Sequence, residues 1–550
     1  MVLRPLFFLL STSLAIAPGC TCNKTEVAAE DAALPAVEAP APAPDGLLAD
    51  LFVPTPNATW QRLQRGVGGT LGILPSSLGG IACAFAGLDP NLAQEIDGTA
   101  PLTGALADDP KDVAWAVALK ISEPRRAKDV LFESETSRYV SRPVAGMTLI
   151  VPKSGGSTSS VAALANGGYL VLARSEADLT RLGPYVYRTV PTKASPANGA
   201  IILDAPPAAL KGPVRARIAA LWDGARSELA KKDDAARAAH GGRAPDYADP
   251  RAVLSVLDGM VQGRLALLGD LDRMRLVVDV LETSVRADLV ATPGEGEGPS
   301  RTAVASMRPG DAAPLLEGAD SPHALFFRDD EKGRTETASD IEDAVKKALG
   351  ERLGAPEAKR LHSAVLGWTR ARGDWATLGL VGQDGLFLRA PAANAEAADH
   401  ALRDLLAVVS AAPLKRGLRI QDMTVGAGTA QLAYGDAPAK GASPKKASVA
   451  WTAKGGEIAV TLSTPGSAAG AQPTTKKLGD EPSILAAVQA LDKTVTFAAV
   501  AQPLKLDPVR ALLPAAPVIL AWGKRDSAAY FRIETSDGLV RELLKMRMGL

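Results

Sequence analysis

The chain has 550 residues, of which 47% are hydrophobic and only 4% are aromatic. This length predicts two or three domains, each able to bury a sizeable core. The 61 Lys and Arg residues balance 61 Asp and Glu residues, so the formal net charge is zero. With no basic excess, the composition argues against nucleic-acid binding and against electrostatic attachment to an anionic membrane.

The first residues have the pattern of a bacterial lipoprotein signal. Arg4 supplies a positive charge, residues 6–16 form a mainly apolar h-region, and Gly19 directly precedes Cys20. Such an apolar segment is too short to anchor a chain across a bilayer, and a signal peptidase requires small side chains before its cleavage site. We therefore expect residues 1–19 to be removed and Cys20 to carry acyl chains that hold the protein to a membrane. The alternative is an ordinary secretory signal cut at the small residues just before the cysteine.

The residues around the cysteine also predict which membrane holds the chain. The resemblance to the bacterial lipobox covers Gly19 and Cys20, whereas Ala17 stands where Leu is usual. Thr21 follows the cysteine, and in enteric bacteria the absence of Asp at this position favours the outer membrane. We therefore expect the anchor to lie on the periplasmic face of the outer membrane.

Residues 20–46 are rich in Ala, Pro and Glu and contain few large apolar groups. This composition predicts a disordered tether after the lipidated cysteine, with folded sequence beginning near Leu47. Cys22 could pair with Cys83 in an oxidising periplasm. The apolar neighbours of Cys83 favour instead a free thiol that packs as a small hydrophobe.

Residues 47–268 are predicted to form a first α+β domain that ends in a helical pair. Pro124 and a capping box at Ser175 each mark the start of a helix. Strands are expected at 113–121, 137–151, 161–173 and 200–204, and helices at 124–133, from 176, at 208–239 and at 250–268.

Residues 269–550 are predicted to form a second α+β domain. Asn394 is the expected N-cap of a helix whose apolar residues recur with helical spacing. Strands are expected at 274–280, 283–291, 375–389, 418–434, 448–461, 494–498, 518–522 and 528–533, and helices at 339–370, from 395, at 484–491 and at the C-terminus.

One order of elements occurs twice along the chain. A strand, a helix, two strand-rich runs, a short helix and a strand follow one another in 113–204 and again in 375–498. We therefore expect an α+β fold with two similar halves of mainly antiparallel sheet packed against helices, joined by a long helical segment. Beyond the signal, no apolar run approaches the ~20 residues that cross a bilayer.

No residue pattern predicts a catalytic, cofactor or metal site. The nucleophile motif Gly-x-Ser-x-Gly is absent, and no His lies at the spacing of zinc ligands. The acidic runs 233–234 and 329–331 lack the pattern of a calcium loop and are interpreted as solvated surface. The histidines are expected at the surface and most tryptophans in cores or on sheet faces: His240, His323, His362 and His400, and Trp60, Trp115, Trp222, Trp375, Trp451 and Trp522.

Four features of the sequence point to a known group of proteins. They are the Cys20 signal, the Ala- and Pro-rich tether, the Ala-, Leu- and Arg-rich body, and short segments such as residues 73–80. With these features the mature chain resembles large lipoproteins of predatory and soil-living delta-proteobacteria, especially myxobacteria. The resemblance implies a location rather than a role, and Cys20 is the one functional residue that it carries over.

Together these features favour a membrane-tethered periplasmic protein that binds or scaffolds other envelope components without catalysis. One alternative is a carrier or chaperone for lipid or other apolar ligands, by analogy with curved antiparallel sheets that enclose such ligands. A second alternative is a cryptic hydrolase, in which polar residues distant in sequence converge in a cleft.

Overall fold

The computed structural model describes residues 38–550 except 69–70, 73, 111, 155–159, 194–198, 240–249, 319–320, 351–352, 382–384, 418, 436–444, 465–475, 507–515 and 549–550. The chain divides into two units of closely packed residues. One unit contains residues 1–214, 273–287 and 540–550, and the other contains residues 215–272 and 288–539. The predicted signal, Cys20 and Cys22 lie outside the described residues.

The first ten strands and their helices extend from Leu47 to Pro293. They are β1 (Leu47–Val53), α2 (Pro56–Val67), α3 (Leu78–Ala86), β2 (Leu102–Asp108), β3 (Val113–Lys120), α4 (Pro124–Lys128), β4 (Tyr139–Val144), β5 (Met147–Pro152), β6 (Val161–Ala165), β7 (Tyr169–Ala173), α5 (Glu176–Arg188), β8 (Ile201–Ala205), α6 (Pro207–Ala209), α7 (Arg215–Ala239), α8 (Pro250–Gly269), β9 (Leu271–Val280) and β10 (Ser284–Pro293).

The remaining elements extend from Pro299 to Met548. They are α9 (Pro299–Ser306), α10 (Ala313–Leu316), β11 (His323–Arg328), α11 (Glu331–Leu349), α12 (Ala355–Ala371), β12 (Trp375–Val381), β13 (Gly385–Pro391), α13 (Ala395–Val409), α14 (Ala412–Gly417), β14 (Ile420–Val425), β15 (Thr429–Tyr434), β16 (Lys445–Lys454), β17 (Glu457–Ser463), α15 (Pro482–Gln489), β18 (Val495–Ala501), β19 (Val518–Arg525), β20 (Ala528–Ser536) and α16 (Asp537–Met548).

The strand pairings repeat along the chain. In the first half β1 pairs with β2 and β8, β3 pairs with β2 and β7, strands β4 to β7 form a meander, and β9 pairs with β8 and β10. Each of these pairings recurs with the strand numbers raised by ten. The predicted α+β fold of mainly antiparallel strands is therefore confirmed, and its two halves share one topology.

The repetition reaches individual residues in the opening hairpin of each half. Phe52 on β1 lies opposite Thr103 on β2, and Phe326 on β11 lies opposite Thr377 on β12. All four side chains are buried. A buried aromatic residue beside a buried Thr therefore occupies the same place in both halves, although the sequences around them differ.

The connection between β8 and β9 is where the halves differ most. Ala205 at the end of β8 lies directly opposite Met274 on β9, so the two strands have the register of a hairpin. Helices α6, α7 and α8 are inserted in the turn of this hairpin, and they account for the helices predicted at 208–239 and 250–268. The matching connection from β18 to β19 spans only residues 502–517. The helix pair α7–α8 is therefore an addition to the repeated fold.

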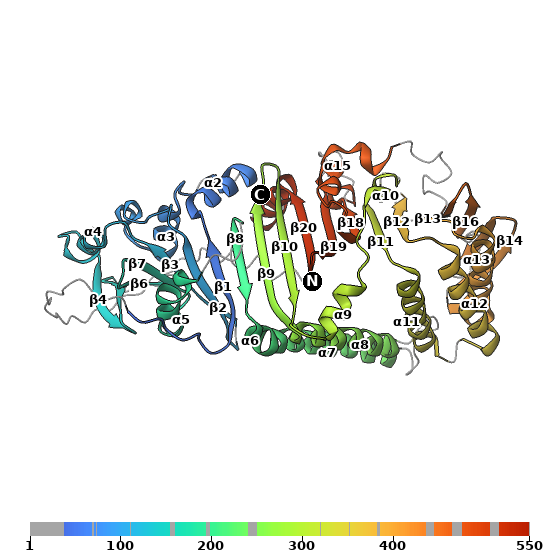
Figure 1. The fold of residues 1–550 in the computed structure, drawn as a ribbon, viewed down its shortest axis with the longest axis horizontal. Helices are drawn as coiled ribbons and strands as arrows, with labels where there is room; N and C mark the ends of the chain where they lie inside the picture. Colours follow the sequence, from blue (N-terminus) through green and yellow to red (C-terminus); the bar gives the residue numbers. More distant parts are fainter. Residues whose placement is uncertain are drawn as a thin grey trace. The chain divides into compact units, whose positions relative to one another are not determined.

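Helices cover both faces of the sheet in the first unit (Figure 1). Ala116 and Val171 pack with residues of α5 such as Leu182, whereas the opposite face packs Leu170 against α3 residues that include Cys83. This alternation follows from the strand period of two residues, which sends successive side chains to opposite faces. In the second unit, α10 and α15 cover β11, β18 and β19.

Most predicted elements are confirmed, including both helix caps. Ser175 accepts a hydrogen bond from the Asp178 N–H, and Asn394 accepts one from the Ala397 N–H. The single helix predicted at 339–370 is wrong, because α11 ends at Leu349 and α12 starts at Ala355. Gly350 has a φ of +52°, a conformation that favours glycine and ends a helix, and so divides the segment in two.

Cys83 is buried, as expected for a packed thiol, with only 1% of its surface exposed. Burial, with a smaller contribution from the Asp89 carboxylate, raises the pKa of this thiol to about 12. Since the thiolate is the reactive form, we predict that Cys83 resists alkylation at pH 8 and reacts only when the protein unfolds. A Cys20→Ser/Cys22→Ser chain, which keeps only this thiol, can be assayed with a chromogenic disulfide reagent with and without denaturant. Rapid labelling of the folded chain would contradict the prediction.

Candidate functional site

The described histidines do not form a metal site. Among the described residues, no group of three His, Cys, Asp or Glu side chains is arranged to hold a metal ion. His362 Nδ1 lies 2.9 Å from a carboxylate oxygen of Glu342, and His400 Nε2 lies 4.0 Å from Glu396. Both histidine side chains are largely exposed, as predicted, while His240 lies outside the described residues.

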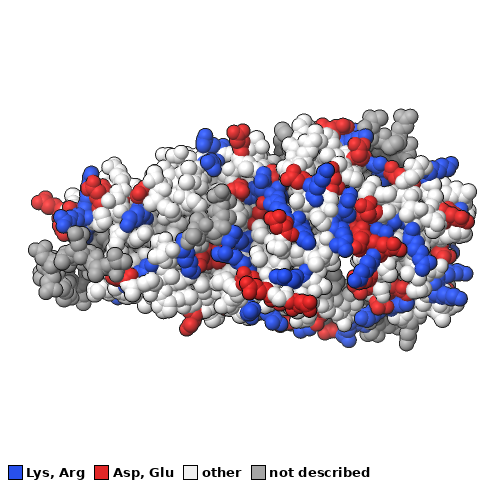
Figure 2. Space-filling view, in the orientation of Figure 1, with Lys and Arg blue, Asp and Glu red and all other residues white. Residues whose placement is uncertain are grey.

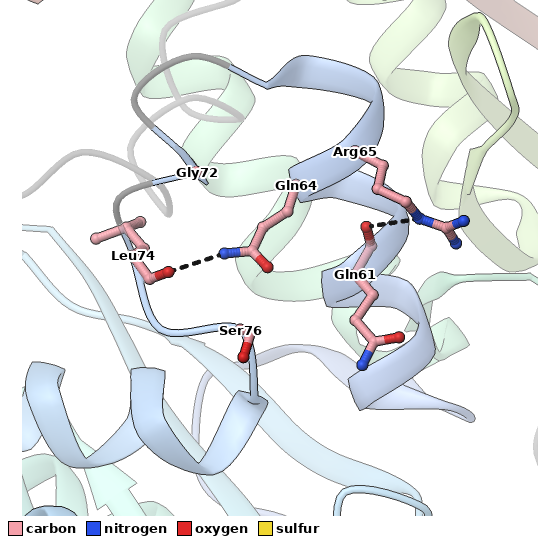
Figure 3. A pocket seen from close by; sticks show the side chains of 6 residues that line it. All are labelled: Gln61, Gln64, Arg65, Gly72, Leu74 and Ser76. Atoms are coloured by element: carbon pink, nitrogen blue, oxygen red, sulfur yellow. Dashed lines mark hydrogen bonds between the residues drawn. The ribbon is translucent and has the colours of Figure 1, made fainter.

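A surface hollow of about 500 Å³ lies beside α2. Gln61, Gln64 and Arg65 line it from the helix, and Gly72, Leu74 and Ser76 line it from the following segment (Figure 3). The Gln64 amide donates hydrogen bonds to the carbonyls of Leu71 and Leu74, at 3.0 and 3.1 Å. Its side chain therefore holds the wall of the hollow together, and the lining contains no pairing of a nucleophile with a base.

A polar cluster in the first unit joins the buried Asp50 and Tyr185 to Lys193, whose side chain is 40% exposed. The Tyr185 hydroxyl donates to Asp50 at 2.9 Å, and the Lys193 ammonium donates to both. Burial raises the pKa of Tyr185. Burial lowers the pKa of Lys193, but its hydrogen bonds to Asp50 and Tyr185 outweigh this, so the net shift is upward. Tyrosine stays protonated and lysine stays charged, so neither is activated as a base or nucleophile.

Asp204 extends this cluster, because it lies directly opposite Asp50 on the neighbouring strand. Arg273 donates from Nε to Asp204 at 2.7 Å, and Arg275 forms a longer ion pair with the same carboxylate. This cluster was not predicted from the sequence, because its members come from β1, α5, the segment after α5, β8 and β9 and lie far apart along the chain. Their mutual pairing gives it a structural role.

The interpretation of the two acidic runs as solvated surface is confirmed for Asp234 and Glu331, which are exposed, and is wrong for Asp233 and Asp329. Asp233 is buried and accepts a hydrogen bond from Arg237 at 2.6 Å. Asp329 pairs with Arg372 and with Arg334. Both carboxylates find their cations through helix or tertiary contacts that a short acidic run in the sequence does not reveal.

Glu342 on α11 is buried beside Lys346 and His362. Burial raises the pKa of its carboxyl, but the hydrogen bonds from Lys346 and His362 outweigh this and leave the pKa below its usual 4.5. A depressed pKa stabilises the fold above the unfolded-state pKa, and the contribution is lost as the pH falls through the folded-state pKa. We predict that Glu342→Gln destabilises the protein at pH 7, and that the difference from the natural chain begins to shrink near pH 4.5 and is lost as the pH falls through the lower folded-state pKa.

Urea unfolding from pH 3 to pH 8 measures this difference. Glu336→Gln is the matched control on the same helix, because the Glu336 side chain is exposed and lies 3.8 Å from Lys332. A penalty for Glu342→Gln that does not change with pH would contradict the assignment.

The helix pair α7–α8 exposes large aliphatic side chains. Ile218, Leu221 and Leu229 on α7 and Val253, Leu257 and Met260 on α8 are all exposed, Leu221 to 65% and Met260 to 60%. Aliphatic side chains of a soluble helix usually pack against a core, so a set of six on two adjacent helices marks a contact surface.

Polar contacts hold the two helices together. The Trp222 indole N–H on α7 donates to Asp258 on α8 at 2.8 Å, and Arg226 lies 3.4 Å from the same carboxylate. Arg251 on α8 pairs with Asp233 at 3.3 Å and Asp234 at 2.5 Å on α7. The pair therefore places polar groups between its helices and several of its aliphatic groups outside.

Helix α8 also corrects an expectation from the sequence. Pro250–Gly269 is a helix of 20 residues that is long and apolar enough to cross a bilayer, the one such helix among the described residues, and 6% of its most apolar window is buried. The expectation that no such segment follows the signal was wrong. The charged residues Arg251, Asp258 and Arg264 interrupt the run of apolar residues, but the helix as a whole is still apolar enough to meet the criterion.

Charge on the surface is mixed. Figure 2 shows Lys and Arg side chains intermingled with Asp and Glu on the face in view, without a large field of one sign. This mixture agrees with the zero net charge of the sequence. The exposed aliphatic residues of α7 and α8 are therefore the surface feature with the clearest chemical character, and they form the candidate functional site.

No protein-family model and no curated protein sequence matches the chain. A solved structure, crystal form I of TP0453, is similar over 46% of this chain and 77% of that one, with 11% sequence identity and a TM-score of 0.21. Similarity at this level gives no information about the role of the chain.

Proposed function

We propose that this chain is a membrane-tethered, non-enzymatic binding protein of the bacterial cell envelope. In this proposal acyl chains on Cys20 hold the protein at the periplasmic face of the outer membrane. The helix pair α7–α8 is the surface that binds another component of the envelope. The observation that carries the proposal is the exposure of six large aliphatic side chains on a helix pair that is added to a repeated fold. In repeat proteins, insertions into one repeat are often the binding face.

The polar groups of the fold support binding rather than catalysis. Asp50, Tyr185 and Lys193 bond to one another, and the pKa shifts of Tyr185 and Lys193 keep both in unreactive forms. The hollow beside α2 is open to solvent, and the Gln64 amide that lines it donates its hydrogen bond to the carbonyl of Leu71 in the opposite wall. The exposed aliphatic side chains of α7–α8 favour a surface-binding protein over the carrier alternative, because a carrier holds its ligand in an enclosed apolar cavity.

Metabolic labelling with a clickable fatty acid tests the anchor. We expect the full-length chain to incorporate the label and to fractionate with outer membranes, whereas Cys20→Ser loses the label. Cys22→Ser is the matched control and should stay labelled. An unlabelled natural chain, or turnover of substrates by the purified protein in a broad hydrolase screen, would contradict the proposal.

A further inference from the structure

We infer that α7–α8 lies on a lipid bilayer, parallel to its surface, with the exposed aliphatic side chains among the acyl chains. The inference rests on the proposed function, because the lipidated Cys20 supplies the membrane. It goes further by naming lipid, rather than an envelope protein, as what the helix pair contacts.

The exposed side chains form one stripe on each helix. Leu221 and Leu229 lie eight residues apart on α7, and Ile218 lies three residues before Leu221, so the three share a face. On α8, Leu257 and Met260 are three residues apart and share a face in the same way, together with Val253. Each helix therefore carries one stripe of exposed aliphatic side chains that can contact an apolar environment.

The polar contacts between the helices fit this environment. Asp258 accepts from the Trp222 indole and pairs with Arg226, so its carboxylate is neutralised within the helix pair. Charged groups that contact lipid need such partners, because an unpaired charge is costly to transfer from water. A helix pair joined by polar groups can keep these contacts while its outer stripes enter the acyl region.

Charge also favours a lipid surface. The described helices α7 and α8 contain eight Lys and Arg residues and five Asp and Glu residues, whereas the whole chain is balanced. This local basic excess complements anionic headgroups. Lys and Arg side chains can lie along apolar surface while their charged ends reach the headgroups.

The segment before the described residues limits the distance to the membrane. Glu38 already contacts the first unit, since it accepts a hydrogen bond from Tyr187 at 2.8 Å. Residues 20–37 can therefore separate this contact from the anchor by at most on the order of 60 Å, given ~3.3–3.6 Å per extended residue. An anchor on so short a segment raises the effective concentration of the chain at the lipid surface, so that a weak apolar contact becomes populated.

Two glycines on α8 suggest a second copy of the chain as the alternative to lipid at this surface. A Cβ atom added at Gly259 or Gly263 would meet no other atom within 4 Å, so both glycines are open to the outside. Glycines four residues apart on an apolar helix also allow close contact with a second helix. A second copy of the chain is therefore the alternative that the experiment must separate from lipid.

Vesicle flotation of the full mature chain with Cys20→Ser tests the inference without the anchor. We expect this chain to float with phosphatidylcholine vesicles and to bind at least tenfold more tightly when a quarter of the lipid is phosphatidylglycerol, an increase that added salt reduces. Adding Leu221→Ser, Leu257→Ser and Met260→Ser should reduce binding at least tenfold. The matched control is Ile341→Ser with Leu405→Ser, which removes exposed aliphatic groups from α11 and α13 and should leave binding unchanged.

Two results would overturn the inference. One is a Cys20→Ser chain that does not float with either vesicle. The other is a lipid-free dimer, detected by light scattering, that the three α7–α8 substitutions dissociate. Circular dichroism shows whether each variant is folded. The anchor is tested separately, because fatty-acid labelling of the natural chain does not depend on α7–α8.

Discussion

Replacing Arg532 by Met should lower the free energy of unfolding by about 3–5 kcal/mol, because it leaves the Asp288 carboxylate without its main partner in a low-dielectric site. Arg532 on β20 is only 3% exposed. Its Nε and Nη2 each donate to Asp288 on β10 at 2.7 Å. Burial lowers the pKa of Arg532, but the hydrogen bonds to Asp288 outweigh this and raise it, so the guanidinium stays charged.

The matched control removes both charges. Asp288→Asn with Arg532→Met leaves no unpaired buried ion, because Arg525, the other cation beside Asp288, is 39% exposed. The double variant should therefore be more stable than Arg532→Met alone even though it contains one more substitution. Urea unfolding of the four chains of this cycle gives the coupling free energy. If Arg532→Met unfolded at the same denaturant concentration as the natural chain, this pair would not contribute to the stability of the second unit.

Replacing Phe326 by Ala should also cost about 3–5 kcal/mol of stability, through lost burial and the cavity that remains. Phe326 is fully buried on β11, between Thr377 of β12 and Ala498 of β18. Because β11 has a neighbour on both sides and helices α10 and α15 over it, the surrounding residues have little freedom to close the cavity.

Val425→Ala is the control for Phe326→Ala, because Val425 on β14 is exposed and its truncation should change stability by less than about 0.5 kcal/mol. Phe52→Ala should resemble Phe326→Ala, since Phe52 occupies the same place in the first half. Equal stability of Phe326→Ala and Val425→Ala, measured by chemical denaturation, would contradict the account of the core.

Local signals in the sequence were sufficient for much of this fold. Ser175 and Asn394 have side chains that cap a helix directly, so their effect does not depend on distant residues. The repeated order of strands and helices was also visible, and the structure shows that the strand pairings repeat with it. By contrast, β2 was missed, because Leu102–Asp108 contains small residues such as Gly104 and Ala105 without a clear alternating pattern. Its neighbours β1 and β3 define it as a strand.

The candidate site was harder to predict, since its character depends on exposure. The apolar residues of α7 and α8 have the spacing of a core-facing helix, and sequence alone does not show whether a core covers them. Asp258 and Trp222 are 36 residues apart in the chain, so their hydrogen bond between the helices could not be predicted from local sequence patterns. The tether and Cys20 lie outside the described residues, and lipidation stays a prediction from the signal.

We propose that α7–α8 is an insertion that binds the membrane, and that the repeated fold forms without it. The ends of the pair lie within reach of one arginine side chain, since Nη1 of Arg215 is 3.4 Å from the position that a Cβ atom on Gly269 would take. Residues 216–268 can therefore be replaced by a short Gly-Ser linker in the Cys20→Ser chain. We predict that this chain unfolds cooperatively, keeps its sheet signal in circular dichroism and no longer floats with phosphatidylglycerol vesicles. Vesicle binding equal to that of the intact Cys20→Ser chain, or loss of the fold, would contradict the claim.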